Sequence, residues 1–229
     1  MKTRLNVINK LADAIAAVHR AHPVRVGIDG FAAVGKTTLA DELVAPLQQR
    51  GREVIRVSID GFHHPAEIRH HRGRHCPHGY YQDSFNHEAI VSHVLVPLGA
   101  QGDRRFKPAC YDYRTGTAVD ADQEEAPVDA ILLFDGIFLH RPELQDHWDF
   151  TVFVHADFPV MLKRACERDI DKFTSEERVR QSFERRFIPG SRLYLEQERP
   201  YARAHLVVNN NEVHNPTLHA DVRSISELE

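Results

Sequence analysis

The sequence has little that would place the protein in a membrane or an oxidising compartment. It contains three widely spaced cysteines, Cys76, Cys110 and Cys166, which indicates no disulfide framework. It has no long apolar run, and polar residues follow Met1 to Leu5, so neither a membrane span nor a secretory signal is predicted. A net charge of −4 gives no basic field for nucleic acid. We therefore expect a cytoplasmic protein that contacts neither nucleic acid nor membrane.

Length and composition are those of an ordinary globular chain. With 229 residues, 42% of them hydrophobic and 27% charged, the chain can bury a full core. It contains no internal repeat or low-complexity linker, so we expect one domain over residues 1–229, as a monomer or a homo-oligomer. Residues 1–22 are predicted to form an N-terminal helix. Apolar residues recur there at helical spacing: Leu5, Ile8, Leu11, Ile15 and Val18.

The most informative stretch is GFAAVGKTT at residues 30–38, which fits the pattern GxxxxGK[ST]. A β-branched strand candidate at 24–28 precedes it, and a helix candidate at 39–50 follows, which is the context that this motif needs. Backbone N–H groups in such a loop form a concave anion site, reinforced by the helix dipole. Lys36 is expected to reach the β- and γ-phosphates of a nucleotide. The predicted binding residues are Gly30, Phe31, Ala32, Ala33, Val34, Gly35, Lys36, Thr37 and Thr38.

Short apolar stretches alternate with helical ones in the rest of the chain. Strands are predicted at 54–59, 130–134, 150–154 and 205–208, helices through 89–95, 159–168 and 175–187, and a hairpin at 106–117. This alternation is typical of an α/β protein with a doubly wound sheet and ligands at the carboxyl ends of its strands. The expected fold is a P-loop NTPase with about five parallel strands and helices on both faces. Residues 159–200 would form a helical lid and the helices after it, and the hairpin would lie on the substrate side.

Three carboxylates end strands or adjoin the phosphate loop: Asp29, Asp60 and Asp135. Phosphoryl transfer needs a polarised acceptor and a metal ion. Asp60 is the candidate that orients or deprotonates an acceptor hydroxyl. Asp135 resembles a Walker B acid and would hold Mg²⁺ directly or through water, with the Thr37 hydroxyl as a second ligand. A helix cap or turn is the alternative role for Asp60 and Asp135, and it is the role expected of Asp29.

Two arginines are candidates for neutralising the transferred phosphoryl group. Arg164 and Arg168 lie four residues apart on one predicted helix and so share a face. That arrangement suits a lid that brings guanidinium groups onto the β- and γ-phosphates when it closes. The alternative is a solvated helix face on which the arginines pair with Glu167, Asp169 and Asp171. Because the chain also has a phosphate loop, we favour the lid over the solvated helix face.

Five segments together resemble the uridine kinase family of P-loop nucleoside kinases. They are GFAAVGKTT, VSIDGF at 57–62, PACYDYRTG at 108–116, LLFDGIF at 132–138 and RACERD at 164–169, in the family's order and covering most of residues 24–210. The resemblance implies ATP-dependent, Mg²⁺-requiring phosphorylation of the 5′-hydroxyl of uridine or cytidine. It implies Asp60 as the base, Tyr111 against the nucleobase, and Arg164 and Arg168 in the lid.

The sequence departs from the family pattern at two places. The family's phenylalanine-aspartate-histidine-proline run, which holds the ribose hydroxyls, is matched to residues 79–85, where Asp83 would take that part. The hairpin has Arg114 and Thr115 where the family has a histidine. An arginine there can equally bind a carboxylate or phosphate on a different acceptor. The same chemistry on nicotinamide riboside, pantothenate or a sugar is therefore the alternative.

Histidines crowd residues 63–78, together with Cys76. Such a cluster can bind Zn²⁺ or Ni²⁺, and the protein would then be a nucleotide-switch or metal-delivery NTPase. The spacing matches no established finger pattern, the neighbouring Arg69, Arg72 and Arg74 would repel a cation, and no NKxD guanine motif follows a late strand. A substrate-facing loop in which Arg72 contacts the acceptor is favoured. A protein that binds ATP without turnover is the third interpretation.

Overall fold

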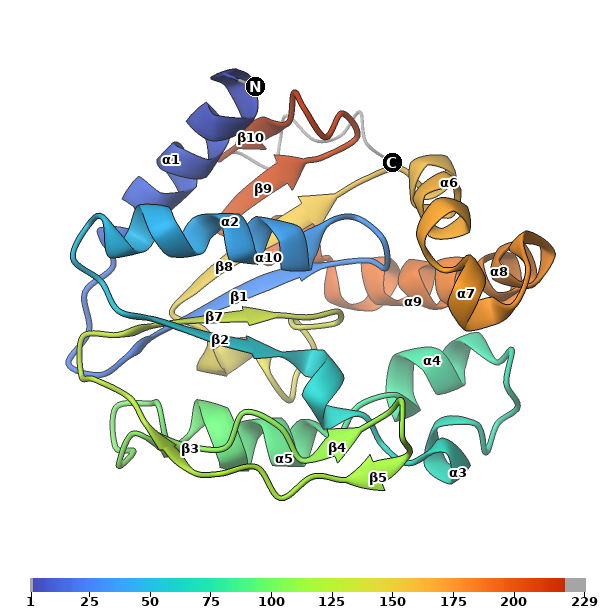
Figure 1. Cartoon of the computed structure of the whole chain (residues 1–229), viewed down its shortest axis with the longest axis horizontal. Helices are drawn as coiled ribbons and strands as arrows, with labels where there is room; N and C mark the ends of the chain where they lie inside the picture. Colours follow the sequence, from blue (N-terminus) through green and yellow to red (C-terminus); the bar gives the residue numbers. More distant parts are fainter. Residues whose placement is uncertain (1, 221–229) are drawn as a thin grey trace.

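The computed structural model describes residues 2–220, which form a six-stranded central sheet in the order β10-β9-β8-β1-β7-β2 (Figure 1). Five strands run parallel, and β10 is antiparallel at the edge beside β9. The strands are β1 (Val24–Gly30), β2 (Val54–Ser58), β7 (Ile131–Asp135), β8 (Phe150–His155), β9 (Leu206–Asn209) and β10 (Thr217–His219). The predicted α/β fold with about five parallel strands is confirmed, and β10 is an addition to it.

Helices pack on both faces of this sheet. In Figure 1, α2 crosses the near face and α10 lies behind the strands, while α6 to α9 gather beside one end of the sheet. No helix of residues 2–220 has the length and apolar character to cross a bilayer. The helices are α1 (Lys2–Ala16), α2 (Lys36–Gln48), α3 (Ala66–Arg69), α4 (Pro77–Asp83), α5 (His87–Ile90), α6 (Phe158–Arg168), α7 (Ile170–Phe173), α8 (Glu176–Ser182), α9 (Ile188–Glu198) and α10 (Pro200–Arg203).

The central strands are apolar along their whole length because both of their faces are covered. Every residue of β7 and β8 is buried, and so are all residues of β1 except one. In a parallel sheet with helices on both sides, neither face meets water, so an uninterrupted apolar run replaces the alternating pattern. The carboxylates Asp29 and Asp135 lie at the carboxyl ends of these buried strands, where the sheet opens toward a ligand.

Several elements differ in extent from their predictions. Helix α1 ends at Ala16, short of residue 22, and Arg52 binds the free carbonyl groups of Ala16 and Val18 just beyond it. The helices predicted through 89–95 and 175–187 each contain a π-helical turn, at Val91–Leu95 and Phe183–Phe187.

Short regular elements lie outside the central sheet. The polar stretch 63–83 holds α3 and α4, and α4 begins with Pro77, whose fixed φ suits the first turn of a helix. The predicted hairpin consists of β4 (Tyr111–Asp112) and β5 (Thr117–Ala118). Before it, β3 (Arg105–Phe106) pairs with β6 (Glu124–Glu125) in an antiparallel ladder.

Candidate active site

The phosphate loop follows β1 and needs glycine at two positions. Gly30 has φ 146° and Gly35 has φ 97°, a region that favours glycine. A Cβ on Gly30 would lie 2.4 Å from the carbonyl oxygen of Val154, and one on Gly35 would lie 2.8 Å from Asn210 Nδ2. Asn210 donates from that nitrogen to the Val34 carbonyl at 2.7 Å, so the end of β9 fixes the loop from behind.

Lys36 opens α2 and lies at the centre of the site's charges. Its Nζ donates to the carbonyl of Phe31 at 2.6 Å, across the loop. Burial lowers the pKa of Lys36 to about 8, against the opposing effect of Asp135, Asp29 and Asp60. These carboxylates end β1 or follow the neighbouring strands, so the parallel sheet brings them around one ammonium group, as predicted from the chain order.

Thr37 and Asp135, the two predicted metal ligands, are in contact. The Thr37 hydroxyl donates to Asp135 Oδ2 at 2.6 Å, and Ser58 Oγ lies 3.5 Å from the same oxygen. Asp135 is buried while Thr37 is exposed toward the loop. A hydroxyl and a carboxylate oxygen beside a phosphate-binding loop are the donor set that Mg²⁺ takes in such sites, so the residues present fit this ion.

Asp60 lies in a 3₁₀ turn, Ile59–Phe62, directly after β2. Its backbone is fixed because its N–H donates to Ser58 Oγ and its carbonyl lies 3.0 Å from His63 Nδ1. The side chain is exposed. The carboxylate also lies near Arg168, whose pKa is raised mainly by its hydrogen bond to Asp169 and further by Asp60. Asp60 is therefore an accessible carboxylate beside the phosphate loop.

The two arginines predicted to belong to a lid share α6 but contact different elements. Arg168 bonds to both carboxylate oxygens of Asp169, at 2.9 and 2.7 Å, and lies on the side of Asp60. Arg164 instead donates to the backbone carbonyls of Asn210 and Asn211, at 2.7 and 3.0 Å. Thus Arg168 lies with the site, whereas Arg164 ties α6 to the segment that also holds the phosphate loop.

An open cavity of about 370 Å³ lies between the hairpin and α5. Tyr111, which is predicted to lie against the acceptor, lines this cavity, whereas Arg114 is exposed at the hairpin turn, 5.8 Å from the centre of the Tyr113 ring. The cavity adjoins Asp60 through His63, which lies against the backbone of Asp60. Its lining residues are His63, Pro65, Asn86, Glu88, Ala89, Ser92, His93, Cys110 and Tyr111.

Two residues predicted to bind the acceptor bind each other. Arg72 Nε lies 2.9 Å from Asp83 Oδ2, so each neutralises the charge of the other, and neither lines the cavity. The histidines around them are dispersed: the His63 ring packs at a tilt against the rings of Phe85 and Tyr113, and His70 accepts a hydrogen bond from Arg186. Over the described residues 2–220, no three His, Cys, Asp or Glu side chains form a group that could hold a metal ion.

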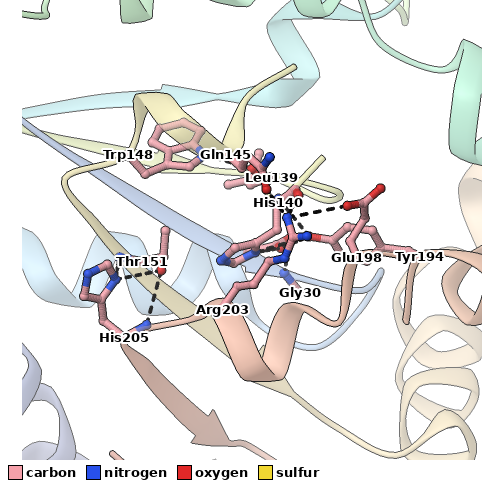
Figure 2. A network of polar contacts seen from close by, with 11 residues as sticks. Gly30, Leu139, His140, Gln145, Trp148, Thr151, Tyr194, Glu198, Arg203 and His205 are labelled. Atoms are coloured by element: carbon pink, nitrogen blue, oxygen red, sulfur yellow. Dashed lines mark hydrogen bonds and ion pairs between the residues drawn. The ribbon is translucent and has the colours of Figure 1, made fainter. Parts of the chain in front are cut away.

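Asp29 belongs to a buried hydrogen-bond network beneath the phosphate loop. It is fully buried and accepts hydrogen bonds from the Gly30 N–H at 2.7 Å and from the Tyr194 hydroxyl, while His140 Nδ1 lies 2.8 Å away. Figure 2 shows His140 and Tyr194 meeting next to Gly30. Burial and the adjacent Asp29 raise the pKa of Tyr194 well above its usual value, so the hydroxyl remains a donor. This network joins the start of the loop to α9.

Removing the Tyr194 hydroxyl is expected to destabilise the protein. Tyr194→Phe leaves the buried Asp29 carboxylate with one donor fewer, so the free energy of unfolding should fall by about 1–3 kcal/mol. Urea denaturation followed by circular dichroism measures this change. Tyr111→Phe, which deletes a hydroxyl from a half-buried ring, serves as the control. Equal unfolding midpoints for the two variants would contradict this role.

Comparison with known proteins places this site in a family. The family model described as "Phosphoribulokinase / Uridine kinase family" matches residues 25–214. The chain belongs to this family. A uridine kinase of Leuconostoc citreum is 30% identical over 151 residues, which is 66% of this chain and 70% of the relative. Uridine kinase-like protein 5 of Arabidopsis thaliana is 24% identical over 79% of this chain, which spans 38% of that longer protein.

Solved structures agree with this fold. A possible uridine kinase from Bacillus stearothermophilus has a TM-score of 0.71 at 24% identity, over 90% of this chain and 99% of the other. D-glycerate 3-kinase from Cryptococcus neoformans has a TM-score of 0.59 at 14% identity, over 91% and 94%. At these identities the likeness concerns the fold alone. The family membership confirms the predicted class, a P-loop kinase of the uridine kinase type.

The structure places in the cavity a residue that the sequence analysis does not single out, Asn86. Phe85, Asn86 and His87 match the first three positions of the family's phenylalanine-aspartate-histidine-proline run, with asparagine in place of aspartate. Asn86 lines the cavity with Tyr111, whereas Asp83, the residue first chosen, is paired with Arg72. This match lies at the downstream end of residues 79–85, and asparagine in place of aspartate makes it harder to recognise from the sequence.

Proposed function

We propose that the protein is an ATP-dependent, Mg²⁺-requiring kinase that phosphorylates the 5′-hydroxyl of uridine or cytidine. One observation carries this proposal: Lys36, the Thr37–Asp135 pair and the accessible Asp60 lie together at the carboxyl ends of the strands, next to a cavity of about 370 Å³. Phosphoryl transfer requires these groups. The family membership and the uridine kinase relative support a nucleoside as the acceptor.

The donor side consists of the phosphate loop. Its backbone N–H groups and Lys36 would bind the polyphosphate of ATP, and Thr37 and Asp135 would hold Mg²⁺. The metal ion, when bound, neutralises charge on the β- and γ-phosphate oxygens. Arg168 lies on the side of Asp60 and can place its guanidinium on the transferring group when α6 moves inward.

The acceptor side consists of Asp60 and the cavity. Asp60 would accept the proton of the hydroxyl that attacks the γ-phosphate, since its carboxylate is exposed and its backbone is fixed. The Tyr111 ring would lie against the pyrimidine, and the Asn86 amide would contact the ribose hydroxyls.

The cavity also supports a second candidate acceptor. Asn86 is neutral where the family has an aspartate, and Arg114 stands where the hairpin of the family has a histidine. The first change removes a carboxylate, and the second adds a guanidinium that can bind a carboxylate or phosphate on a different acceptor. The same transfer to nicotinamide riboside, pantothenate or a sugar is therefore the alternative. The metal-delivery interpretation receives no support from the histidines, which contact aromatic rings, arginines and backbone.

Incubation with Mg²⁺-ATP and a pool of nucleosides, vitamins and sugars tests this proposal. We expect mass spectrometry to detect uridine or cytidine heavier by one phosphoryl group. Product from another pool member would retain the transfer mechanism and assign the specificity to the Asn86 and Tyr111 cavity. Hydrolysis of ATP with no phosphorylated product from any pool would contradict the kinase assignment.

A further inference from the structure

The proposed metal-site carboxylate already has a cation beside it. Arg56 Nη2 lies 2.9 Å from Asp135 Oδ1, while the other oxygen, Oδ2, accepts from Thr37. The Asp135 side chain is 3% exposed and that of Arg56 is 23% exposed, so water screens this pair poorly. The two oxygens of Asp135 therefore have separate partners, a guanidinium on one side and hydroxyl groups on the other.

Arg56 is held in this position from three directions. Its Nη1 donates to the Leu133 carbonyl at 2.8 Å, and its Nε and Nη2 lie 3.1 and 3.0 Å from Asp41 Oδ1. Asp41 belongs to α2 and Asp135 to β7, so the guanidinium on β2 joins two elements that carry the phosphate loop and the metal site. An arginine remains charged at any physiological pH, so this positive charge is permanent.

We propose that Arg56 is a positioning residue of the metal site that makes binding of a divalent cation depend on the nucleotide. Its charge opposes a free Mg²⁺ at Asp135, and its hydrogen bond keeps Oδ1 turned away, so that only Oδ2 faces Thr37. The phosphates of ATP bring the negative charge that offsets Arg56. The inference rests on the assignment of Thr37 and Asp135 to the metal under the proposed function.

Binding of Mn²⁺ to the nucleotide-free protein, followed by electron paramagnetic resonance, tests this role without any catalytic turnover. Arg56→Gln removes the charge and should tighten Mn²⁺ binding by about 10-fold or more, because a permanent positive charge close to the divalent ion is lost. Arg56→Lys restores the charge and should return the affinity toward that of the native protein.

Arg52→Gln is the matched control. Arg52 lies just before β2 and donates to the backbone carbonyls of Ala16, Val18 and Asp129, with no carboxylate partner in residues 2–220. The same change of side chain there should leave Mn²⁺ affinity within about twofold of the native value, because no charge near Asp135 is altered.

Asp41→Asn gives an independent test with the opposite sign. The Asp41 side chain is 65% exposed, so the fold tolerates the change, and among the carboxylates of residues 2–220 Arg56 is then paired with Asp135 alone. Mn²⁺ binding to the free protein should weaken several-fold. If Arg56→Gln does not fold, Asp41→Asn tests the role of Arg56 in its place. A Mn²⁺ affinity of Asp41→Asn equal to the native value would overturn the proposal.

Two further outcomes separate this inference from the proposed function. Native Mn²⁺ affinity in a folded Arg56→Gln protein would overturn the role of Arg56 while leaving the metal site in place. Thr37→Val should weaken Mn²⁺ binding in the presence of a non-hydrolysable ATP analogue. If it does not, the metal-site assignment itself fails, and the inference about Arg56 fails with it.

Discussion

Asp60→Asn is expected to abolish phosphoryl transfer and to leave ATP binding intact. Asparagine has the shape of aspartate but cannot accept the proton of the attacking hydroxyl, so kcat should fall by about 10²- to 10⁴-fold. The carboxylate of Asp60 is exposed and accepts no hydrogen bond within the described residues, so the substitution leaves no buried donor unpaired. A coupled spectrophotometric assay gives kcat, and titration calorimetry gives the affinity for ATP.

Asp13→Asn is the control for this variant. Asp13 lies on α1, is 69% exposed and pairs with Arg50, away from the site, so turnover should match that of the native protein. If Asp60→Asn instead abolished ATP binding, Asp60 would belong to the metal shell. Turnover near the native value would refute its role as the base.

Lys36→Met is expected to lower kcat by about 10²- to 10³-fold or more. The ammonium group meets charge that develops on the transferring phosphoryl, so its contribution is larger in the transition state than in the ground state. Lys10→Met, on the exposed face of α1, is the control. Near-native turnover in Lys36→Met would refute the phosphate-loop assignment.

Lys36 also predicts a pH dependence of nucleotide binding. Burial lowers the pKa of Lys36 to about 8, so in the free protein it is protonated below that pH and loses its charge above it. Polyphosphate binds the protonated form, so affinity for ATP should be constant below pH 8 and should fall about tenfold per pH unit well above it. Calorimetry between pH 7 and 9.5 measures this slope, which Lys36→Met should lack.

The features that the sequence predicted best depend on local chain chemistry. The phosphate loop needs glycine at Gly30 and Gly35 because of its own backbone, and β7 and β8 are apolar runs because both of their faces are covered. Their order along the chain was sufficient to place Asp60 and Asp135 near Lys36, because parallel strands end at one edge of the sheet.

The features that were missed depend on contacts between distant segments. Arg56 reaches Asp135 because β2 pairs with β7, a neighbour that no local pattern identifies. Arg164 and Arg168 have the spacing of one helix face, yet Arg164 binds the segment after β9 and Arg168 binds Asp169. Asp83 is predicted to hold the ribose hydroxyls, but the short helices α3 and α4 bring Arg72 onto it.

The bond between Asn210 and Val34 has a consequence for the order in which the protein matures during synthesis. The two residues are 176 positions apart, and Arg164 of α6 is fixed on the same segment as the loop. A ribosome-bound chain that has completed only β1, α2 and β7 contains the phosphate-loop sequence, but it lacks the hydrogen bond from the Asn210 side chain to the loop backbone. Contacts of such separation form late. Nucleotide capture by the nascent protein should therefore begin only after β9 has joined the sheet, so ATP would bind the finished fold and would not guide its assembly.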